Sequence, residues 1–283
     1  MMNINHSGIL YIVATPIGNL KDITQHAIEI LQSVDCIAAE DTRHSQHLLK
    51  HLSITTPLIS LHEHNEEERA HQLISRLRKG ESLALISDAG TPLISDPGYI
   101  LVSKVKNAHI PVVPIPGPCA AIAALSVAGL PTDRFVFEGF LPAKTKLRHE
   151  RLEALQSESR TLVFYESPHR ILNSLQTMCQ VFGPDRSMVL ARELTKIFET
   201  VRSGTIGEIT EWVTQDENQQ RGEIIVLVAG IEAISIPENT VFSDKVLNVL
   251  LETLPLKQAT EIAAKITGER KNDLYHRALQ LKK

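Results

Sequence analysis

The feature that most constrains the fold is an alternation of short β-rich runs with amphipathic helical patterns through the first half of the chain. This alternation is typical of βαβ units, in which largely parallel strands form a sheet covered by helices. Residues 65–80 combine early acidic side chains, an apolar stripe and late basic residues, which predicts a helix. We predict strands over residues 9–14, 35–39, 58–61, 82–87 and 110–115.

The pattern changes after the proline-rich segment 111–118, because its prolines obstruct both a helix and a central strand. Beyond it we predict a second α/β layer. A segment over 234–240, with Pro237 near its centre, is predicted to be a linker into a helical tail. The length of 283 residues also favours about two main domains. We therefore predict an N-terminal α/β domain over 1–116, a C-terminal α/β domain over 117–235 and a small helical appendage over 236–283. The later strands are predicted over 134–140, 161–166, 187–193, 198–204 and 223–230, and the later helices over 147–157, 170–181, 206–214, 242–254, 256–267 and 271–281.

Composition excludes several classes of protein. Hydrophobic residues make up 43% and charged residues 22% of the chain, which argues against disorder and against a coiled-coil rod. No apolar stretch approaches the roughly 18 residues of a membrane span, and the start lacks the features of a secretory signal, so we expect a cytoplasmic protein without a membrane partner. Three cysteines without a CxxC pair predict reduced thiols. The histidine pairs His44/His47 and His62/His64 lack a third ligand, so we predict no metal site.

The charge is unevenly distributed. The net charge is −4, yet residues 257–283 carry seven basic against three acidic side chains, which is +4 and leaves −8 elsewhere. A second basic cluster lies over 144–151, and both can face phosphates. Helices separated by Pro255 and Gly268 are compatible with a helix-turn-helix-like unit or with a packed helical tail. The excess of basic residues favours a unit that contacts RNA over a tail that serves only in packing. The RNA-binding candidates here are Lys144, Lys146, Arg148, Arg270, Lys271 and Arg277.

Four loops follow predicted strands directly, over residues 14–20, 39–45, 87–98 and 114–121. Because the carboxyl ends of strands build the ligand crevice in open α/β sheets, we expect these loops to cluster. In the third loop, Asp88 can accept hydrogen bonds from a ligand, Gly90 allows close backbone approach and Thr91 offers a hydroxyl. The alternative is a tight turn capped by Asp88. The absence of GxxxxGK[ST] and GxGxxG motifs disfavours nucleotide hydrolysis and NAD chemistry.

Three further positions offer alternatives between structure and chemistry. The PGPCAA segment opens a small-residue helix, whose first amides can face a polar ligand group or serve only in packing. Glu166 ends a strand and is either a cap for the next helix or part of a site. Lys196, between Glu193 and Glu199, is more often a solvated ion pair than a catalyst, and we keep it as a candidate.

The motifs, taken in order, resemble a known family. ILYIVATPIGNLKDITQHAIEIL, AAEDTRHSQHLL, ISDAGTPLISDPG, PIPGPCAAIAALSVAGLP, FVFEGFLP, TLVFYESPHRI and ARELTKIFE run from about Gly8 to Gly230. They are similar to those of the bacterial 16S rRNA (cytidine(1402)-2′-O)-methyltransferase family, which belongs to the tetrapyrrole-methylase superfamily. The resemblance implies two α/β domains that bind S-adenosylmethionine in the cleft between them, and a homodimer.

The resemblance also assigns residues. The AEDTR segment would line the RNA-facing side, with Arg43 holding a phosphate, although a helix N-terminus with an acidic cap is the alternative. The cofactor region falls on Pro16, Asp88, Gly90, Thr91, Pro92, Gly117, Pro118, Cys119, Ala120 and Tyr165.

The implied reaction is attack of a ribose 2′-oxygen on the sulfonium methyl. A nearby base, or a lysine that stabilises the developing oxyanion, would assist this step. The candidates are Glu40, Glu166, Glu193 and Lys196. The expected partner is 16S rRNA in the small ribosomal subunit, at an unstacked nucleotide, and no DNA partner is expected. Two alternatives stay open: a methyltransferase of the same superfamily acting on a porphyrin or corrin, and a non-enzymatic RNA-binding module.

Overall fold

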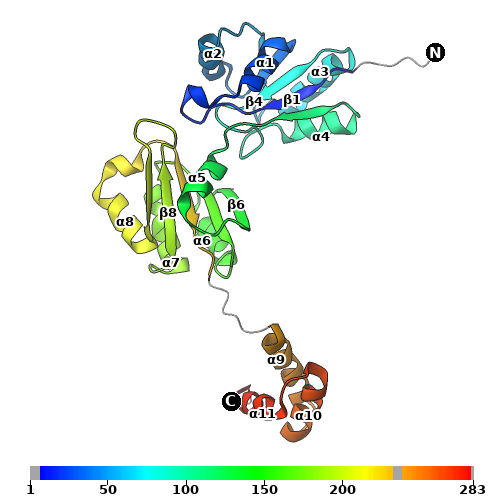
Figure 1. The fold of residues 1–283 in the computed structure, drawn as a ribbon, viewed down its shortest axis with the longest axis vertical. Helices are drawn as coiled ribbons and strands as arrows, with labels where there is room; N and C mark the ends of the chain where they lie inside the picture. The colour runs from blue at the N-terminus through cyan, green and yellow to red at the C-terminus, as the bar shows by residue number, and fades with distance from the viewer. Residues whose placement is uncertain (1–6, 232–237, 282–283) are drawn as a thin grey trace, which may run out of the picture. The chain divides into compact units, whose positions relative to one another are not determined.

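The computed structural model describes residues 7–231 and 238–281. The chain divides into two compact units, one up to Ile231 and one from Glu232 onward. The first unit contains two five-stranded sheets, each with its own helices (Figure 1). The predicted α/β class with a helical appendage is therefore confirmed, whereas the domain boundaries at 116 and 235 stay predictions.

All strands of the first sheet are parallel, in the order β3-β2-β4-β1-β5. The strand β5 contains Pro114 and lies at the edge, where a missing amide donor costs no ladder hydrogen bond. The bounds are β1 Leu10–Val13, β2 Cys36–Ala39, β3 Leu58–Ser60, β4 Leu83–Ile86 and β5 Val112–Ile115.

Helices cover both faces of this sheet, and alternate strand residues point to each. Leu83 and Leu85 pack toward α3 (Glu66–Arg78) and α4 (Tyr99–Asn107), which follow β3 and β4. Ala84 and Ile86 pack toward α1 (Gln25–Ser33) and α2 (Thr42–His51). A short 3₁₀ turn, η1 (Leu20–Asp22), precedes α1. All polar strand-end loops are thereby left at one edge of the sheet.

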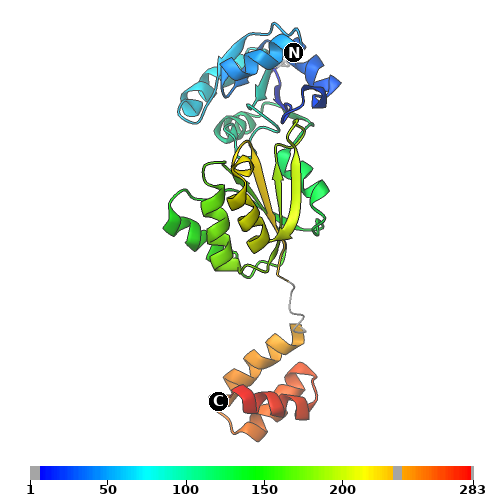
Figure 2. The same cartoon turned by 90° about the vertical axis from the view of Figure 1, so that its left-hand side faces the viewer.

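The second sheet is mixed, in the order β6-β7-β10-β8-β9, with β6 and β7 parallel and the other pairs antiparallel. Along β10, Val226 belongs to the core formed with α6, α7 and α8, whereas Leu227 packs with α5. The ribbon shows helices on both faces of this sheet (Figure 2). The bounds are β6 Phe135–Phe140, β7 Thr161–Glu166, β8 Ser187–Arg192, β9 Thr200–Thr205 and β10 Ile224–Val228, with α5 Ala120–Ala128, α6 Thr145–Ala154, α7 Ile171–Phe182, α8 Ile206–Gln215 and η2 Glu217–Gln220.

The second unit consists of α9 (Glu238–Leu251), α10 (Leu256–Thr267) and α11 (Lys271–Leu281). Its small core contains Leu247 and Leu274 together with alanines, and α10 ends at Gly268 in the left-handed conformation. Residues 238–240 were expected in the linker but begin α9, and the rest of that linker lies outside the described residues. Within residues 7–231 and 238–281, no helix is long and apolar enough to cross a membrane.

Candidate active site

A cavity of about 390 Å³ opens at the carboxyl ends of the first sheet's strands and is closed on its other side by the second sheet. Both sheets lie in the first unit, and each contributes loops that follow or precede its strands. The lining comprises residues 17, 40, 88–91, 94–96, 119–120, 140, 165–168, 191, 194 and 222–225.

Backbone contacts hold the strand-end loops of the first sheet together. Thr15 and Gly90 form an antiparallel bridge, in which each amide donates to the other residue's carbonyl, at 2.8 and 3.1 Å. Gly90 has a φ of 84°, a left-handed conformation that glycine adopts without steric cost. The Thr91 hydroxyl donates to the Pro118 carbonyl at 2.9 Å, which joins the loop after β4 to the loop after β5. The predicted clustering of the loops is therefore confirmed.

Tyr165 forms the facing wall at the end of β7. Its hydroxyl accepts a hydrogen bond from the Ala121 amide in the first turn of α5, at 3.2 Å. The ring packs edge-on against Phe137 and Phe140, with centroids 5.0 and 5.7 Å away. Burial raises the pKa of Tyr165, so the hydroxyl remains neutral over the physiological range.

Three carboxylates from the first sheet line the cavity: Glu40 after β2, and Asp88 and Asp96 after β4. Asp88 Oδ1 accepts the Asp41 amide at 3.1 Å, which ties the end of β2 to the end of β4. Burial, followed by repulsion from Asp96 and Asp88, raises the pKa of Glu40. Burial and the negative charge of Asp88 likewise raise the pKa of Asp96. This wall therefore concentrates negative charge and favours a cationic ligand.

Arg43 lies just outside this wall. Its guanidinium pairs with Asp41 at 3.1 Å, and 88% of its side chain is exposed. The Arg43 hydrogen bonds lower the pKa of Asp41 to about 2. Asp41 also caps α2 by accepting the Arg43 amide, so the acidic-cap interpretation of this segment is confirmed.

Glu166 borders the cavity, but internal contacts occupy both oxygens of its carboxylate. Oε1 accepts the Ser167 amide at 2.8 Å and pairs with Arg170 at 2.9 Å, while Oε2 accepts the Ser174 hydroxyl at 2.6 Å. Only 2% of the side chain is exposed. These contacts favour a structural role for Glu166 over a role as a base, but Glu166 does not cap the next helix, because α7 begins after Arg170 without a side-chain cap hydrogen bond.

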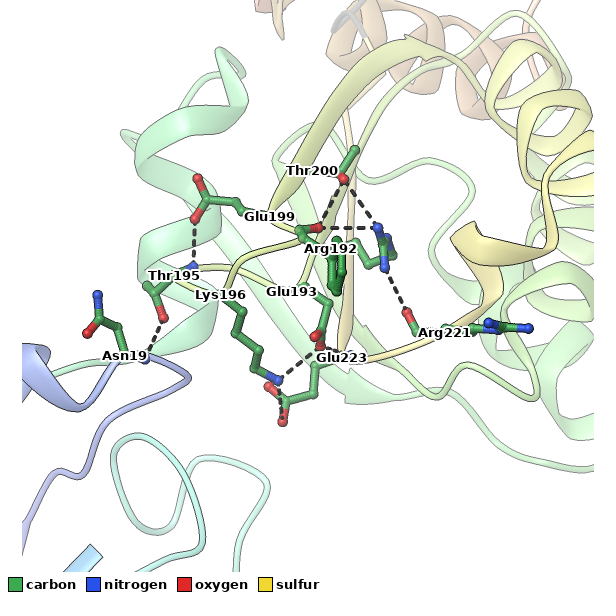
Figure 3. Close-up of polar contacts among 10 residues, drawn as sticks. Asn19, Arg192, Glu193, Thr195, Lys196, Glu199, Thr200, Arg221 and Glu223 are labelled. Carbon is green, nitrogen blue, oxygen red and sulfur yellow. Dashed lines mark hydrogen bonds and ion pairs between the residues drawn. The ribbon is translucent and has the colours of Figure 1, made fainter. Parts of the chain in front are cut away.

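Lys196 and Glu193 lie on the loop between β8 and β9, outside the cavity lining. Figure 3 shows the Lys196 ammonium between two carboxylates, 2.9 Å from Glu193 Oε1 and 3.2 Å from Glu223 Oε1. Burial acts to lower the pKa of Lys196, but these two carboxylates outweigh it and raise the pKa. Burial acts to raise the pKa of Glu193, but the Glu223 amide and Lys196 lower it. Lys196 is therefore a charged, paired lysine beside the cavity wall.

The loop between β8 and β9 is also fixed by Arg192 and by the first sheet. The buried Arg192 guanidinium donates to the carbonyls of Phe198 and Arg221, at 3.2 and 3.4 Å (Figure 3). The Asn19 amide donates to the Thr195 hydroxyl at 3.1 Å and connects the loop after β1 with this loop.

The predicted cofactor residues divide into two groups. Those in the lining are Asp88, Gly90, Thr91, Cys119, Ala120 and Tyr165. The others, Pro16, Pro92, Gly117 and Pro118, belong to the same loops but are not part of the lining. Gly117 permits close loop packing, because an added Cβ would lie 2.9 Å from the Ala14 Cβ. Sequence reasoning missed Asp96, Phe140 and Glu223, although Asp96 lay within a motif already recognised.

The predicted RNA-binding residues differ in their exposure. Lys144 and Lys146 are exposed at the start of α6. Arg148 was expected to face phosphates, but it is 5% exposed and donates to Thr177 at 3.0 Å, so this prediction is wrong. In the second unit, Arg270 is exposed, and Lys271 pairs with Glu261 at 2.9 Å. Arg277 pairs with Asp244 and Glu269 inside the unit.

Metal binding has no obvious site in the part of the chain that the structure describes. There, no three His, Cys, Asp or Glu side chains come together in a group that could hold a metal ion. The expected absence of a metal stays a prediction.

Comparison with solved structures supports the fold. The chain is similar to uroporphyrin-III-C-methyltransferase from Thermus thermophilus, with a TM-score of 0.57 and 21% identity, covering 78% of this chain and 94% of the other. It is also similar to diphthine synthase, with a TM-score of 0.61 and 14% identity, covering 78% and 90%. At these identities the likeness concerns the fold alone.

Sequence comparison identifies the family. Residues 9–210 match Tetrapyrrole (Corrin/Porphyrin) Methylases, and residues 243–282 match the RsmI C-terminal HTH domain. Ribosomal RNA small subunit methyltransferase I of Pseudomonas aeruginosa is 58% identical, covering 97% of this chain and 98% of the relative. The protein of the same name from Escherichia coli O157:H7 is 54% identical, covering 98% and 96%. The chain therefore belongs to the ribosomal RNA small subunit methyltransferase I family, within the tetrapyrrole methylases, and is a methyltransferase.

Proposed function

We propose that this protein transfers a methyl group from S-adenosylmethionine to the ribose 2′-oxygen of cytidine(1402) in 16S rRNA. The observation that carries the proposal is a cavity with Glu40, Asp88 and Asp96 on one wall, in a chain whose relatives are named as methyltransferases of small-subunit ribosomal RNA. The specific nucleotide rests on the family resemblance.

The cavity lining fits the chemistry of S-adenosylmethionine. A sulfonium cation suits the wall formed by Glu40, Asp88 and Asp96, since no ion pair to Lys or Arg involves these carboxylates within residues 7–231 and 238–281. Apolar side chains such as Ile17 and Ile225 complete the lining. The residues proposed to hold the cofactor are Asp88, Gly90, Thr91, Cys119, Ala120 and Tyr165, with Pro16, Pro92, Gly117 and Pro118 shaping their loops.

When bound, S-adenosylmethionine supplies a methyl group on a sulfonium that leaves as a neutral thioether. The chain's contribution is to align the 2′-oxygen, exclude water and accept the hydroxyl proton. The loops joined by Thr15 and Gly90 provide a rigid floor for this alignment. Tyr165 and Phe140 close the opposite side with aromatic rings.

The acidic wall also restricts how RNA can enter. Phosphates are repelled by Glu40, Asp88 and Asp96, so the target ribose must enter while its neighbouring phosphates stay outside. We propose that Arg43, Lys144 and Lys146 hold phosphates at the first unit. In the second unit, Arg270 and Lys271 are the proposed contacts. An unstacked nucleotide satisfies this geometry better than a paired one.

Three further properties are proposed with this function. Ribosomal RNA as substrate implies action in the cytoplasm, on the small ribosomal subunit. The domains are proposed to divide near residues 116 and 235.

We also propose a homodimer, because Ile197 is 94% and Phe198 70% exposed beside the cavity, and pairing would bury them. Sedimentation of the full chain as a monomer would contradict the dimer.

The two alternatives fit the site less well. A porphyrin or corrin substrate carries several carboxylates, which the acidic wall would repel. A non-enzymatic RNA-binding protein would not need a cavity of about 390 Å³ between the sheets with Glu40, Asp88 and Asp96 on one wall.

The proposed activity predicts a single modified ribose. Incubation of purified protein and labelled S-adenosylmethionine with small subunits that lack the modification should place one methyl group on the ribose of cytidine(1402). Nuclease digestion followed by mass spectrometry identifies the nucleotide and the modified atom. Label on a base, on another nucleotide or on an added corrin precursor would contradict the proposal.

Asp88→Ala should weaken S-adenosylmethionine binding roughly 10- to 100-fold. The change removes a cavity carboxylate and its hydrogen bond to the Asp41 amide, and hydrogen bonds to charged groups contribute about 1.5–3 kcal/mol. Titration calorimetry measures the affinity, and the exposed Asp133→Ala serves as the matched control. Unchanged affinity in a folded Asp88→Ala protein would remove Asp88 from the cofactor site.

A chain ending at Ile231 should bind small-subunit RNA more weakly and with a smaller salt dependence. Each lost phosphate contact lowers the slope of log affinity against log salt by about 0.7 to 0.9. Filter binding over a salt series, with full-length Arg270→Ala for comparison, measures the effect. Equal slopes and affinities for the truncated and full chains would show that the second unit does not contact RNA.

A further inference from the structure

The acidic side chains near the cavity differ in whether other groups of the protein already bind their carboxylates, and this difference bears on which of them accepts the proton of the ribose hydroxyl. The Glu166 carboxylate is enclosed by Ser167, Arg170 and Ser174. Glu193 lies outside the lining and holds Lys196. Asp88 accepts the Asp41 amide and fixes the loop. Among the lining carboxylates of the first sheet, Glu40 and Asp96 remain.

The position of Glu40 is set by its backbone. It directly follows β2, a strand flanked on both sides in the sheet, and directly precedes Asp41, which caps α2. The Asp88–Asp41 hydrogen bond holds this junction against the loop after β4. The Glu40 side chain therefore enters the cavity from a rigid strand end, beside the loop that carries Asp96.

Asp96 lies on a strained loop. Leu93 and Ser95 have φ values of 73° and 68°, in a region that side chains other than glycine rarely occupy and that costs about 1–3 kcal/mol per residue. Leu93 packs into the core beneath the first sheet, and the Ser95 hydroxyl oxygen approaches Gly139, 3.0 Å from where a Cβ would lie. Buried Glu66 accepts the Leu101 amide at 2.9 Å and fixes the start of α4, just beyond the loop. Strain maintained by this many contacts indicates a function for the loop.

We propose that Glu40 accepts the proton of the ribose 2′-hydroxyl and that Asp96, which lines the same cavity from the loop after the neighbouring strand β4, is a positioning residue for Glu40. This inference rests on the proposed function, because it concerns the same methyl transfer. As the oxygen–carbon bond forms, the carbon–sulfur bond breaks and its electron pair goes to sulfur. The hydroxyl proton passes to the Glu40 carboxylate, so charge and atoms balance without another reactant.

The charges around Glu40 determine the direction in which the reaction rate should change with pH. Glu40 faces Asp96, Asp88 and Asp41, and Asp96 faces Asp88 and Tyr165. Burial and this repulsion raise the pKa of Glu40 and bring it closer to the working pH, where a carboxylate is a better base. The rate should fall as the pH drops through this raised pKa, because Glu40 becomes protonated. A bound sulfonium opposes that protonation, so cofactor binding should release protons.

The first experiment measures single-turnover methylation of small subunits as a function of pH. Glu40→Gln should slow the reaction roughly 10²- to 10⁴-fold and abolish the acidic limb of the profile. Asp96→Asn should lose less activity and move the acidic limb to lower pH, because the like charge that raises the Glu40 pKa is gone. Asp96→Glu should restore the limb toward its original position. Exposed Asp133→Asn is the matched control and should leave the profile unchanged.

The second experiment does not depend on RNA. Calorimetric titration with S-adenosylmethionine in two buffers of different ionisation enthalpy, over about pH 5 to 8, measures the protons released on binding. The unaltered protein should release protons at the acidic end, Asp96→Asn fewer, and Glu40→Gln fewest. S-adenosylhomocysteine, which lacks the sulfonium charge, should release fewer protons than the methyl donor.

The two arms separate failure of this inference from failure of the proposed function. If no ribose is methylated, the proposed function is wrong, and equal proton release by all variants would then also overturn the Glu40–Asp96 assignment. If methylation occurs but Glu40→Gln keeps the acidic limb while Asp96→Asn loses it, the roles are reversed and the proposal is overturned. An unchanged limb in both variants overturns it as well.

Discussion

The site depends on the backbone pairing of Thr15 with Gly90, which joins the loops after two neighbouring strands of the parallel sheet. Without this bridge, the carboxyl ends of β1 and β4 would present two independent loops. Thr91 extends the connection to Pro118 and so to the start of α5, which packs on the second sheet. One chain of contacts therefore fixes the cavity floor and links it to the opposite wall.

The charge around the cavity is asymmetric because the acidic residues on the side of the second sheet have basic partners, whereas those on the side of the first sheet lie beside other acids. On the side of the second sheet, Glu166 is neutralised by Arg170, while Glu193 and Glu223 share Lys196. On the side of the first sheet, burial and neighbouring acids raise the pKa of Glu40 and of Asp96. The negative potential is thus concentrated on one wall, where it favours a cation and disfavours phosphate. A methyl donor with a sulfonium suits this arrangement, and so does a ribose whose neighbouring phosphates stay outside the cavity.

Much of this architecture could be predicted from the sequence, but the hydrogen-bond and ion-pair partners of individual side chains could not. Short β-rich runs located the strands, and the four predicted strand-end loops located half of the cavity lining, because both follow from local pattern. Glu166 and Arg148 could not be judged in this way. Their partners Ser174 and Thr177 lie in α7, eight and 29 positions away. The order of the second sheet also depends on non-local pairing, since β10 inserts between β7 and β8.

In the second unit, the sequence likewise does not reveal which basic side chains are paired with acids. Counting residues suggests a basic surface, yet Arg277 is held by Asp244 and Glu269, and Lys271 and Lys265 both lie beside Glu261. Paired cations attract phosphate less, because the acid that holds them repels it. Of the two proposed RNA contacts in this unit, exposed Arg270 should therefore attract phosphate more strongly than Lys271, which lies beside Glu261. The net charge of this unit is consequently a poor measure of its attraction for phosphate.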